Sequence, residues 1–424
     1  LQPATPKLDI AIANSEKTTG LNLTNSDLEA LQNGFKSVVI GREDGKGVVT
    51  VNPVTLKNSV TIQSPEGSII TKGTITGTGE TAITFKATTL EIAGDIKTEN
   101  KDIKLESSVT LANDVQLNAG KGTITFGKSV DAGEKALTIT ADEIDFLGGA
   151  ESVSGTNTLT LQPATPELEV TLGDSENYNR LDLTNTDLDS LKAGFKSVTI
   201  GREDGKGAVT IAGDITFNNS VTIQSPKEPG SIKANGTINA TREAEINLIA
   251  GGDISVRSIN TNEQAVTIKA DADNNGSGTV STNLDDTIQT KGGKVDISGY
   301  SITVGNINTS VLEDDGGSKK DGGAVKLSAT SKIATGNIDT TTDYYYLEFI
   351  DDTVLYARGG SVEISTLGEI EVKDVKTAGA PLNITGASIL AGDIVTYNSL
   401  TNMYSDAPDE GFVKLEAKTG NIEV

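Results

Sequence analysis

The feature that most constrains the fold is a short repeat of alternating aliphatic positions that recurs along most of the chain. Each unit holds two or three segments of three to five residues in which Val, Ile or Leu alternate with polar residues, and Gly, Asn or Asp separates the segments. Units without an insertion begin 20 residues apart, at Val362 and Leu382, Ile246 and Val266, and Ile83 and Ile103. Elsewhere the spacing is 22 residues, at Leu117, Ile139 and Leu161.

This pattern predicts an all-β protein that is a parallel β-helix, or β-solenoid, with about 20–22 residues in each coil. Alternation places every second side chain on one face of a strand, and a unit of this length cannot bury that face alone. Stacking successive coils one strand-spacing apart creates a continuous core. A β-sandwich would explain the alternation but not the constant register. We expect the insertions at 310–321, 341–358 and 397–410 to leave the coil as loops or hairpins.

A second, longer repeat shows that one module is duplicated. Residues 21–47 return as residues 181–207 with 20 of 27 positions identical, and the match extends back to Leu1 and Leu161. We therefore divide one continuous solenoid into residues 1–160, 161–245 and 246–424, the first two each starting with a copy of this module. Because the chain opens partway through a motif that recurs complete in its interior, we expect it to be a segment of a longer polypeptide.

The duplicated module carries the chain's strongest helix signal. Ser26 and Glu29 have the spacing of a capping box, in which the side chains of the two residues satisfy each other's backbone N–H groups. Leu28, Leu31 and Phe35 follow at helical spacing, so we expect a short helix whose leucines pack on the flank of the solenoid.

Composition excludes several functional classes. The chain has no Cys and no His, so it cannot form disulfides, thiolate or imidazole metal sites, or a Ser-His-Asp triad. The formal net charge of −24 makes nucleic acid a poor partner, because phosphate backbones require neutralisation by Lys and Arg. No apolar run approaches the length of a membrane span.

Three kinds of sequence motif are shared with a known family of proteins. They are LTLQPATP at 159–166, the GREDGKG segments at 41–47 and 201–207, and Gly-Gly at 292–293, 322–323 and 359–360. Together these motifs resemble the filamentous-haemagglutinin-like family of large secreted exoproteins, and most closely its cyanobacterial branch. Only the duplicated module is specific; the rest of the likeness is compositional. The family's amino-terminal secretion domain does not occur in this sequence.

The resemblance implies a right-handed β-helix that an outer-membrane transporter exports from a Gram-negative-type bacterium by two-partner secretion. It further implies an adhesin or matrix fibre at the cell surface or in the extracellular space. On this reading the protein is not an enzyme, needs no cofactor, associates with itself into fibres or matrix, and presents its surface to a glycan or another cell-surface ligand.

One segment has the opening pattern of a calcium loop. Asp271, Asp273 and Asn275 supply oxygen ligands at positions 1, 3 and 5, and Gly276 follows at position 6. Position 12, however, is Thr282 rather than a bidentate Glu, and no flanking helices are expected. A solvated acidic turn is the favoured interpretation, and calcium remains the alternative.

The main candidate contact surface is a cluster of aromatic residues. It contains five of the sixteen Phe and Tyr residues within 13 positions, namely Tyr344, Tyr345, Tyr346, Phe349 and Tyr356. Tyrosine presents an apolar body and a polar tip, and it is enriched at protein contacts. The segment is expected to be a hairpin outside the regular coils, which either covers an edge of the solenoid or binds a glycan or a neighbouring subunit.

The enzyme alternative is a polysaccharide-cleaving β-helix that uses paired carboxylates. The adjacent acids Asp285-Asp286 and Asp351-Asp352 are the candidates for such a pair. Adjacent residues in a strand, however, point to opposite faces, and no cluster of Asp with Arg or Lys recurs at the 20-residue spacing that would stack such groups on neighbouring coils. The non-catalytic interpretation is therefore favoured.

Overall fold

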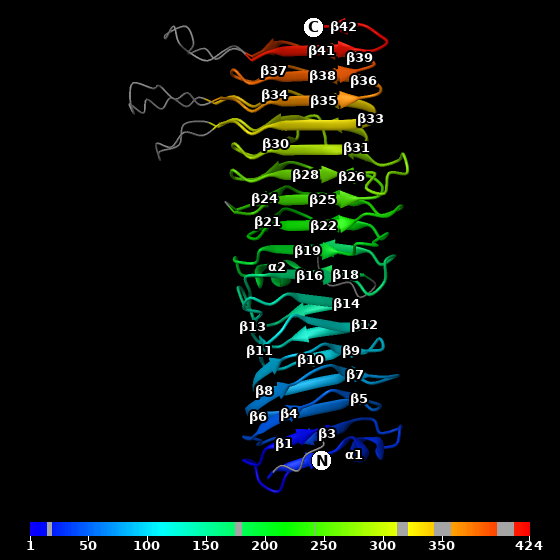
Figure 1. Ribbon diagram of the computed structural model, residues 1–424, viewed down its shortest axis with the longest axis vertical. Helices are drawn as coiled ribbons and strands as arrows, with labels where there is room; N and C mark the ends of the chain where they lie inside the picture. Colours follow the sequence, from blue (N-terminus) through cyan, green and yellow to red (C-terminus); the bar gives the residue numbers. More distant parts are fainter. Residues whose placement is uncertain (15–18, 174–179, 242, 312–320, 343–357, 397–410) are drawn as a thin grey trace, which may run out of the picture. The chain divides into compact units, whose positions relative to one another are not determined.

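The computed structural model describes residues 1–14, 19–173, 180–241, 243–311, 321–342, 358–396 and 411–424. The chain divides into two compact units, Leu1–Arg202 and Glu203–Val424, and the division falls within the second copy of the duplicated module. In each unit, strands from successive coils lie one above another (Figure 1). Within both units the strand pairings in the described part of the chain are parallel, so each unit is a parallel β-helix, as predicted.

The first unit stacks its strands in three columns. The first column consists of β5 (Val54–Leu56), β7 (Ile75–Gly77), β9 (Ile96–Thr98), the first halves of β12 (Val115–Phe126) and β14 (Leu137–Phe146), β16 (Thr158–Gln162) and β19 (Ser197–Gly201). The second column consists of β3 (Val38–Gly41), the first halves of β6 (Val60–Thr71) and β8 (Ile83–Ile92), β10 (Ile103–Leu105) and the second halves of β12 and β14. The third column consists of β1 (Ile10–Ile12), β4 (Val48–Val51), the second halves of β6 and β8, β11 (Ser108–Leu111), β13 (Val130–Asp131) and β15 (Val153–Ser154).

The second unit also has three columns. One consists of β22 (Val221–Ser225), β25 (Ile246–Ala250), β28 (Val266–Lys269), the first halves of β31 (Val295–Val304) and β33 (Val325–Thr335), β35 (Val362–Thr366), β38 (Leu382–Gly386) and β41 (Val413–Ala417). Another consists of β20 (Val209–Ile211), β23 (Ile232–Ala234), β26 (Ile254–Ser255), β29 (Thr279–Ser281), the second halves of β31 and β33, β36 (Glu369–Val372), β39 (Ser388–Ala391) and β42 (Ile422–Glu423). The third is a separate eight-stranded sheet of β21 (Ile215–Phe217), β24 (Ile238–Ala240), β27 (Ile259–Asn260), β30 (Thr287–Gln289), β32 (Asn306–Asn308), β34 (Ile338–Asp339), β37 (Val375–Lys376) and β40 (Ile394–Val395).

The strand registers confirm the predicted coil lengths residue by residue. The pairs predicted at a spacing of 20 are register partners, namely Ile83 and Ile103, Ile246 and Val266, and Val362 and Leu382. The series at a spacing of 22, Leu117 to Ile139 to Leu161, also aligns. These side chains are at most 1% exposed, so the aliphatic columns form the core.

Insertions lengthen a coil without disturbing its register. Val325 pairs with Val362, although the whole of the predicted excursion at 341–358 lies between these two residues. Residues 312–320, 343–357 and 397–410, where the excursions were expected, lie outside the described residues. The Asp44-Gly45 turn is a tight corner, because Gly45 N–H donates to the Arg42 carbonyl at 3.1 Å and the flanking strands β3 and β4 both pair with β6.

Buried threonines cap the corner that follows the eight-stranded sheet in the second unit. Each hydroxyl donates to a backbone carbonyl on the segment that leads from this corner into the next strand. Each threonine is at most 3% exposed. The five threonines, with acceptors, are Thr261 (Gln264), Thr290 (Gly293), Thr309 (Gly323), Thr340 (Gly360) and Thr377 (Ala380). They occupy inward positions of the repeat because their hydroxyl groups satisfy carbonyls that would otherwise be buried without a donor.

The same corner explains the Gly-Gly motif. A Cβ atom at Gly323 would lie 2.0 Å from the carbonyl oxygen of Gly293, and one at Gly360 would lie 2.0 Å from that of Gly323. At Gly323 and Gly360 the backbones of successive coils therefore approach too closely for a residue with a side chain.

We expect Thr340→Val to destabilise the second unit by about 1–3 kcal/mol, because valine keeps the shape of the side chain but leaves the Gly360 carbonyl without its hydroxyl donor at 2.6 Å. Urea unfolding followed by far-ultraviolet circular dichroism measures the change. Thr267→Val, at an outward position of β28, is the matched control and should change stability little. Equal effects of the two substitutions would show that the buried hydroxyl contributes nothing.

Each module contains the expected short helix, but the capping residue differs from the prediction. The helices are α1 (Asn25–Glu29) and α2 (Asn185–Asp189), and their N-caps are Thr24 and Thr184 rather than Ser26 and its counterpart. The prediction was wrong by two residues because an aspartate three positions after a threonine closes the box as well as a glutamate does. Thr24 N–H donates to the Asp27 carboxylate at 2.8 Å.

Candidate functional site

An additional strand in each module creates the most distinctive local geometry of the first unit. In the first module, β2 (Leu21–Leu23) pairs with β1, which pairs in turn with β4. In the second module, β18 (Leu181–Leu183) pairs with β17 (Val170–Leu172) in the same way. One side of the coil thus contains one strand more than a regular coil. This additional strand increases the height of the coil on that side by one strand spacing, about 4.8 Å.

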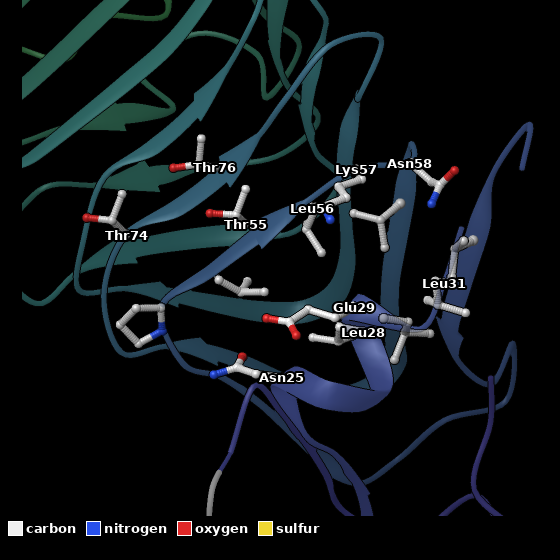
Figure 2. A pocket seen from close by; sticks show the side chains of 15 residues that line it. Asn25, Leu28, Glu29, Leu31, Thr55, Leu56, Lys57, Asn58, Thr74 and Thr76 are labelled. Atoms are coloured by element: carbon white, nitrogen blue, oxygen red, sulfur yellow. The ribbon is translucent and has the colours of Figure 1, made fainter. Parts of the chain in front are cut away.

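In the first module this arrangement leaves a groove between α1 and the strands above it. The cavity measures about 600 Å³. Figure 2 shows Leu28 and Glu29 on the helix facing the chain segment that carries Thr55 and Leu56. We call this the α1 groove; its lining is Asn25, Leu28, Glu29, Leu31, Val38, Ile40, Pro53, Val54, Thr55, Leu56, Lys57, Asn58, Val60, Thr74 and Thr76.

The end of the groove is held in place by a buried amide. The side-chain oxygen of Asn58 accepts hydrogen bonds from the backbone N–H groups of Gly34 at 3.1 Å and Phe35 at 3.2 Å, and its amide nitrogen donates to the Gln32 carbonyl at 3.2 Å. Asn58 is 9% exposed, so these bonds fix the loop that follows the helix. The hydrogen bonds from the Thr24 hydroxyl and N–H lower the pKa of Asp27, which therefore remains ionised as the helix cap.

The lining of the groove combines apolar and polar side chains. Leucine and valine side chains form its apolar part, and threonine hydroxyls with Glu29, Lys57 and Asn25 supply the polar groups. Such a mixed lining suits a small ligand that carries hydroxyl groups on an apolar ring. The sequence analysis did not identify this groove, because its walls come from segments up to about fifty residues apart.

A second unpredicted feature is a group of acidic side chains beneath α2. Glu143 on β14 is 8% exposed, and its Oε2 atom has no hydrogen-bond partner among the described residues. Burial is the main cause that raises its pKa to about 8, and the negative charges of Asp145, Asp182 and Asp187 raise it further. Glu143 is therefore largely protonated at neutral pH, which permits four acidic residues to lie close together.

The three predicted calcium ligands lie in one loop but mainly serve as hydrogen-bond acceptors there. The Asp271 carboxylate accepts from Gly276 N–H at 3.2 Å, and the Asn275 side-chain oxygen accepts from Ser277 N–H at 2.9 Å. Asp273 accepts from Glu228 N–H at 3.0 Å. Within the described part of the chain, no group of three or more acidic residues is arranged to hold a metal ion. Calcium binding here stays a prediction.

Of the two acidic pairs, Asp285-Asp286 lies in a turn. One carboxylate oxygen of Asp286 accepts from the Asn283 side-chain amide at 2.8 Å, and the other accepts from the Ser258 hydroxyl at 3.3 Å. Asp286 thus stabilises a corner of the coil. The pair Asp351-Asp352 and the aromatic cluster, Tyr344, Tyr345, Tyr346, Phe349 and Tyr356, lie outside the described residues.

Comparison with known proteins does not add a family to this picture. No family model, no curated protein and no solved structure matches the chain. A search of the described residues for helices finds none that is both long enough and apolar enough to span a membrane.

Proposed function

We propose that this chain is part of a secreted, non-catalytic structural or adhesive protein, which is displayed on a bacterial cell surface or assembles into extracellular fibres or sheath. The observation that carries the proposal is the registered stacking of coils in each unit. Each coil contributes backbone pairing to its neighbours and a few buried aliphatic side chains, so the surface can be extended by repetition.

The outward positions and the loops would then supply the contacts with ligands. Insertions leave the second unit without changing its register, which allows loop sequences to vary on a constant scaffold. The α1 groove is the candidate for a small glycan ligand in the first unit, and the aromatic cluster at 344–356 is the candidate contact surface in the second. The proposed route of export, through an outer-membrane transporter, rests on the family resemblance alone.

The position of Asp286 supports the non-catalytic form of the proposal. Its two carboxylate oxygens accept hydrogen bonds from Asn283 and Ser258, so it has a structural role at a corner. A glycosidase pair would instead place two carboxyl groups across the scissile bond, separated by about 5–9.5 Å.

Electron microscopy of the purified protein, together with a glycan-binding screen, tests the proposal. We expect rods or ordered filaments, and binding of a glycan without shortening of the polysaccharide chain. Incubation with acidic polysaccharides provides the counter-test. Release of shorter chains that disappears in Asp285→Asn or Asp286→Asn variants would replace the proposal with the enzyme alternative.

A further inference from the structure

A second groove, of about 360 Å³, crosses consecutive coils on the flank of the second unit. It lies at the ends of β28, β35 and β38 and at the bends of β31 and β33, in a column of strands that Figure 1 shows one above another. Its floor consists of hydroxyl side chains that are register partners. Ser298 pairs with Ser328, Ser328 with Ser365, and Ser365 with Thr385. Lys269 pairs with Ser298 and continues the column. We call this the serine groove.

The groove exists because the corner that follows this column carries small side chains in successive coils. Gly299 pairs with Ala329, and Ala329 pairs with Thr366, so the next position along the chain is recessed as well. Larger groups form the walls, among them Asp271 on the loop that follows β28 and Leu367, which is 72% exposed. The recess is therefore a consequence of the repeat sequence.

The hydroxyl groups of the floor have no partner within the described part of the chain. The side chains of Ser298, Ser328, Ser365 and Thr385 are half-buried, yet none forms a hydrogen bond with another described residue. The Lys269 ammonium likewise forms no ion pair with a described residue. The inward threonines of the same coils differ, because each of them donates to a backbone carbonyl. The floor thus offers donors and acceptors to a ligand.

The spacing of these groups requires an elongated ligand. Successive coils are about 4.8 Å apart, so the five positions from Lys269 to Thr385 extend over about 19 Å. The ligand must therefore carry hydrogen-bonding groups at regular intervals. A linear polysaccharide has this property, and the apolar face of a sugar ring can pack against the exposed side chain of Leu367.

Other elongated ligands fit less well. Each strand of the floor is paired on both sides, so a peptide finds no free backbone edge to which it could add as a strand. The same pairing means that the groove does not depend on where the chain begins or ends. A polyanion is disfavoured by the net charge of −24 and by the Asp271 carboxylate in the wall.

We propose that the serine groove binds one strand of a neutral, extended, β-linked polysaccharide, which lies along the side of the coils. The proposal rests on the adhesive form of the proposed function and gives that function a site. Sugar hydroxyl groups exchange hydrogen bonds with the serine and threonine hydroxyls of successive coils, and the Lys269 ammonium donates at one end.

Isothermal titration calorimetry with a β-1,4-linked hexasaccharide of glucose tests the site. We expect the wild type to bind it at least about tenfold more tightly than the α-1,4-linked hexasaccharide, whose chain curves away from a straight groove. Ser328→Leu fills the centre of the groove and should weaken binding at least about tenfold. The double variant Ser328→Ala/Ser365→Ala removes two hydroxyl groups and should weaken it about tenfold.

Ser281→Leu is the matched control and should bind like the wild type. Ser281 is a half-buried, outward serine on β29 that does not line the groove. Circular dichroism establishes that the variants remain folded.

The outcomes separate this site from the proposed function. Equal binding by the wild type and Ser328→Leu would overturn the site, and an adhesive function elsewhere on the surface would stand. A wild type that binds neither hexasaccharide, or prefers the α-linked one, would also overturn the site, whereas rods or filaments in electron microscopy would still support the structural form of the function. Recovery of a shortened hexasaccharide would instead overturn the non-catalytic form of the proposed function.

Discussion

Replacing Phe146 with alanine should destabilise the first unit by about 3–5 kcal/mol, because a large buried ring is lost and the surrounding coils cannot close the cavity fully. Phe146 is 1% exposed and its ring stacks on that of Phe126, with ring centroids 5.1 Å apart. The two rings belong to one column that continues through Leu105 to Phe85. Neighbouring coils in a solenoid support one another, so a cavity here weakens the coils on both sides.

Urea unfolding followed by far-ultraviolet circular dichroism measures this loss. Leu147→Ala is a suitable control, since Leu147 is the next residue, is 65% exposed, and should tolerate truncation with little change. If Phe146→Ala cost no more than Leu147→Ala, the stacked rings would not lie in the core of the coil.

The second large effect is the dependence of stability on pH through Glu143. Its pKa in the folded protein is about 8, above the ordinary value of 4.5 that applies to the unfolded chain. The unfolded chain therefore loses this proton at lower pH than the folded protein does. The stability that the protonated carboxyl contributes is fully present below about pH 4.5 and is lost as pH rises to about 8.

Glu143→Gln removes this titration, because glutamine keeps the shape of the side chain but cannot ionise beside Asp145, Asp182 and Asp187. The variant should be more stable than the wild type at pH 9, by up to about 4 kcal/mol, and the difference should shrink towards pH 5. Urea midpoints at pH 5, 7 and 9 test the prediction, with the exposed Glu106→Gln as control. Parallel pH profiles for wild type and Glu143→Gln would contradict the buried position of this carboxyl.

The coil architecture could be predicted from the sequence because it depends on local alternation and a constant spacing. Both are visible in pairs such as Val362 and Leu382, which are register partners in the structure. The inward position of Thr309 and Thr340 was also visible in the repeat. The role of their hydroxyl groups as hydrogen-bond donors could not be predicted. Their acceptors, the carbonyls of Gly323 and Gly360, come within reach only after the chain has turned the corner.

The candidate site could not be predicted, because its geometry depends on neighbours and not on local sequence. Phe35 and Phe195 occupy equivalent positions in nearly identical segments, yet one is exposed and the other is buried. Similarly, Glu143 and Asp182 come together only because the additional strand β18 lies beside β14. The position of the helix cap was wrong for a simpler reason, since two overlapping segments satisfy the same spacing rule and only the backbone distinguishes them.

The central claim is that coils stack in register as a parallel β-helix, and distances between spin labels in one column test it most directly. Outward residues of the second unit are register partners in the series Asn247, Thr267, Asp296, Lys326, Glu363, Asn383 and Lys414. Labels on introduced cysteines at Asn247 and Glu363, four strand spacings apart, should be about 19 Å apart, and labels at Asn247 and Lys414, six spacings apart, about 29 Å. Distances that grow by about 4.8 Å for each coil, whatever the number of residues in between, would support the account. Distances that do not increase along this series would contradict it.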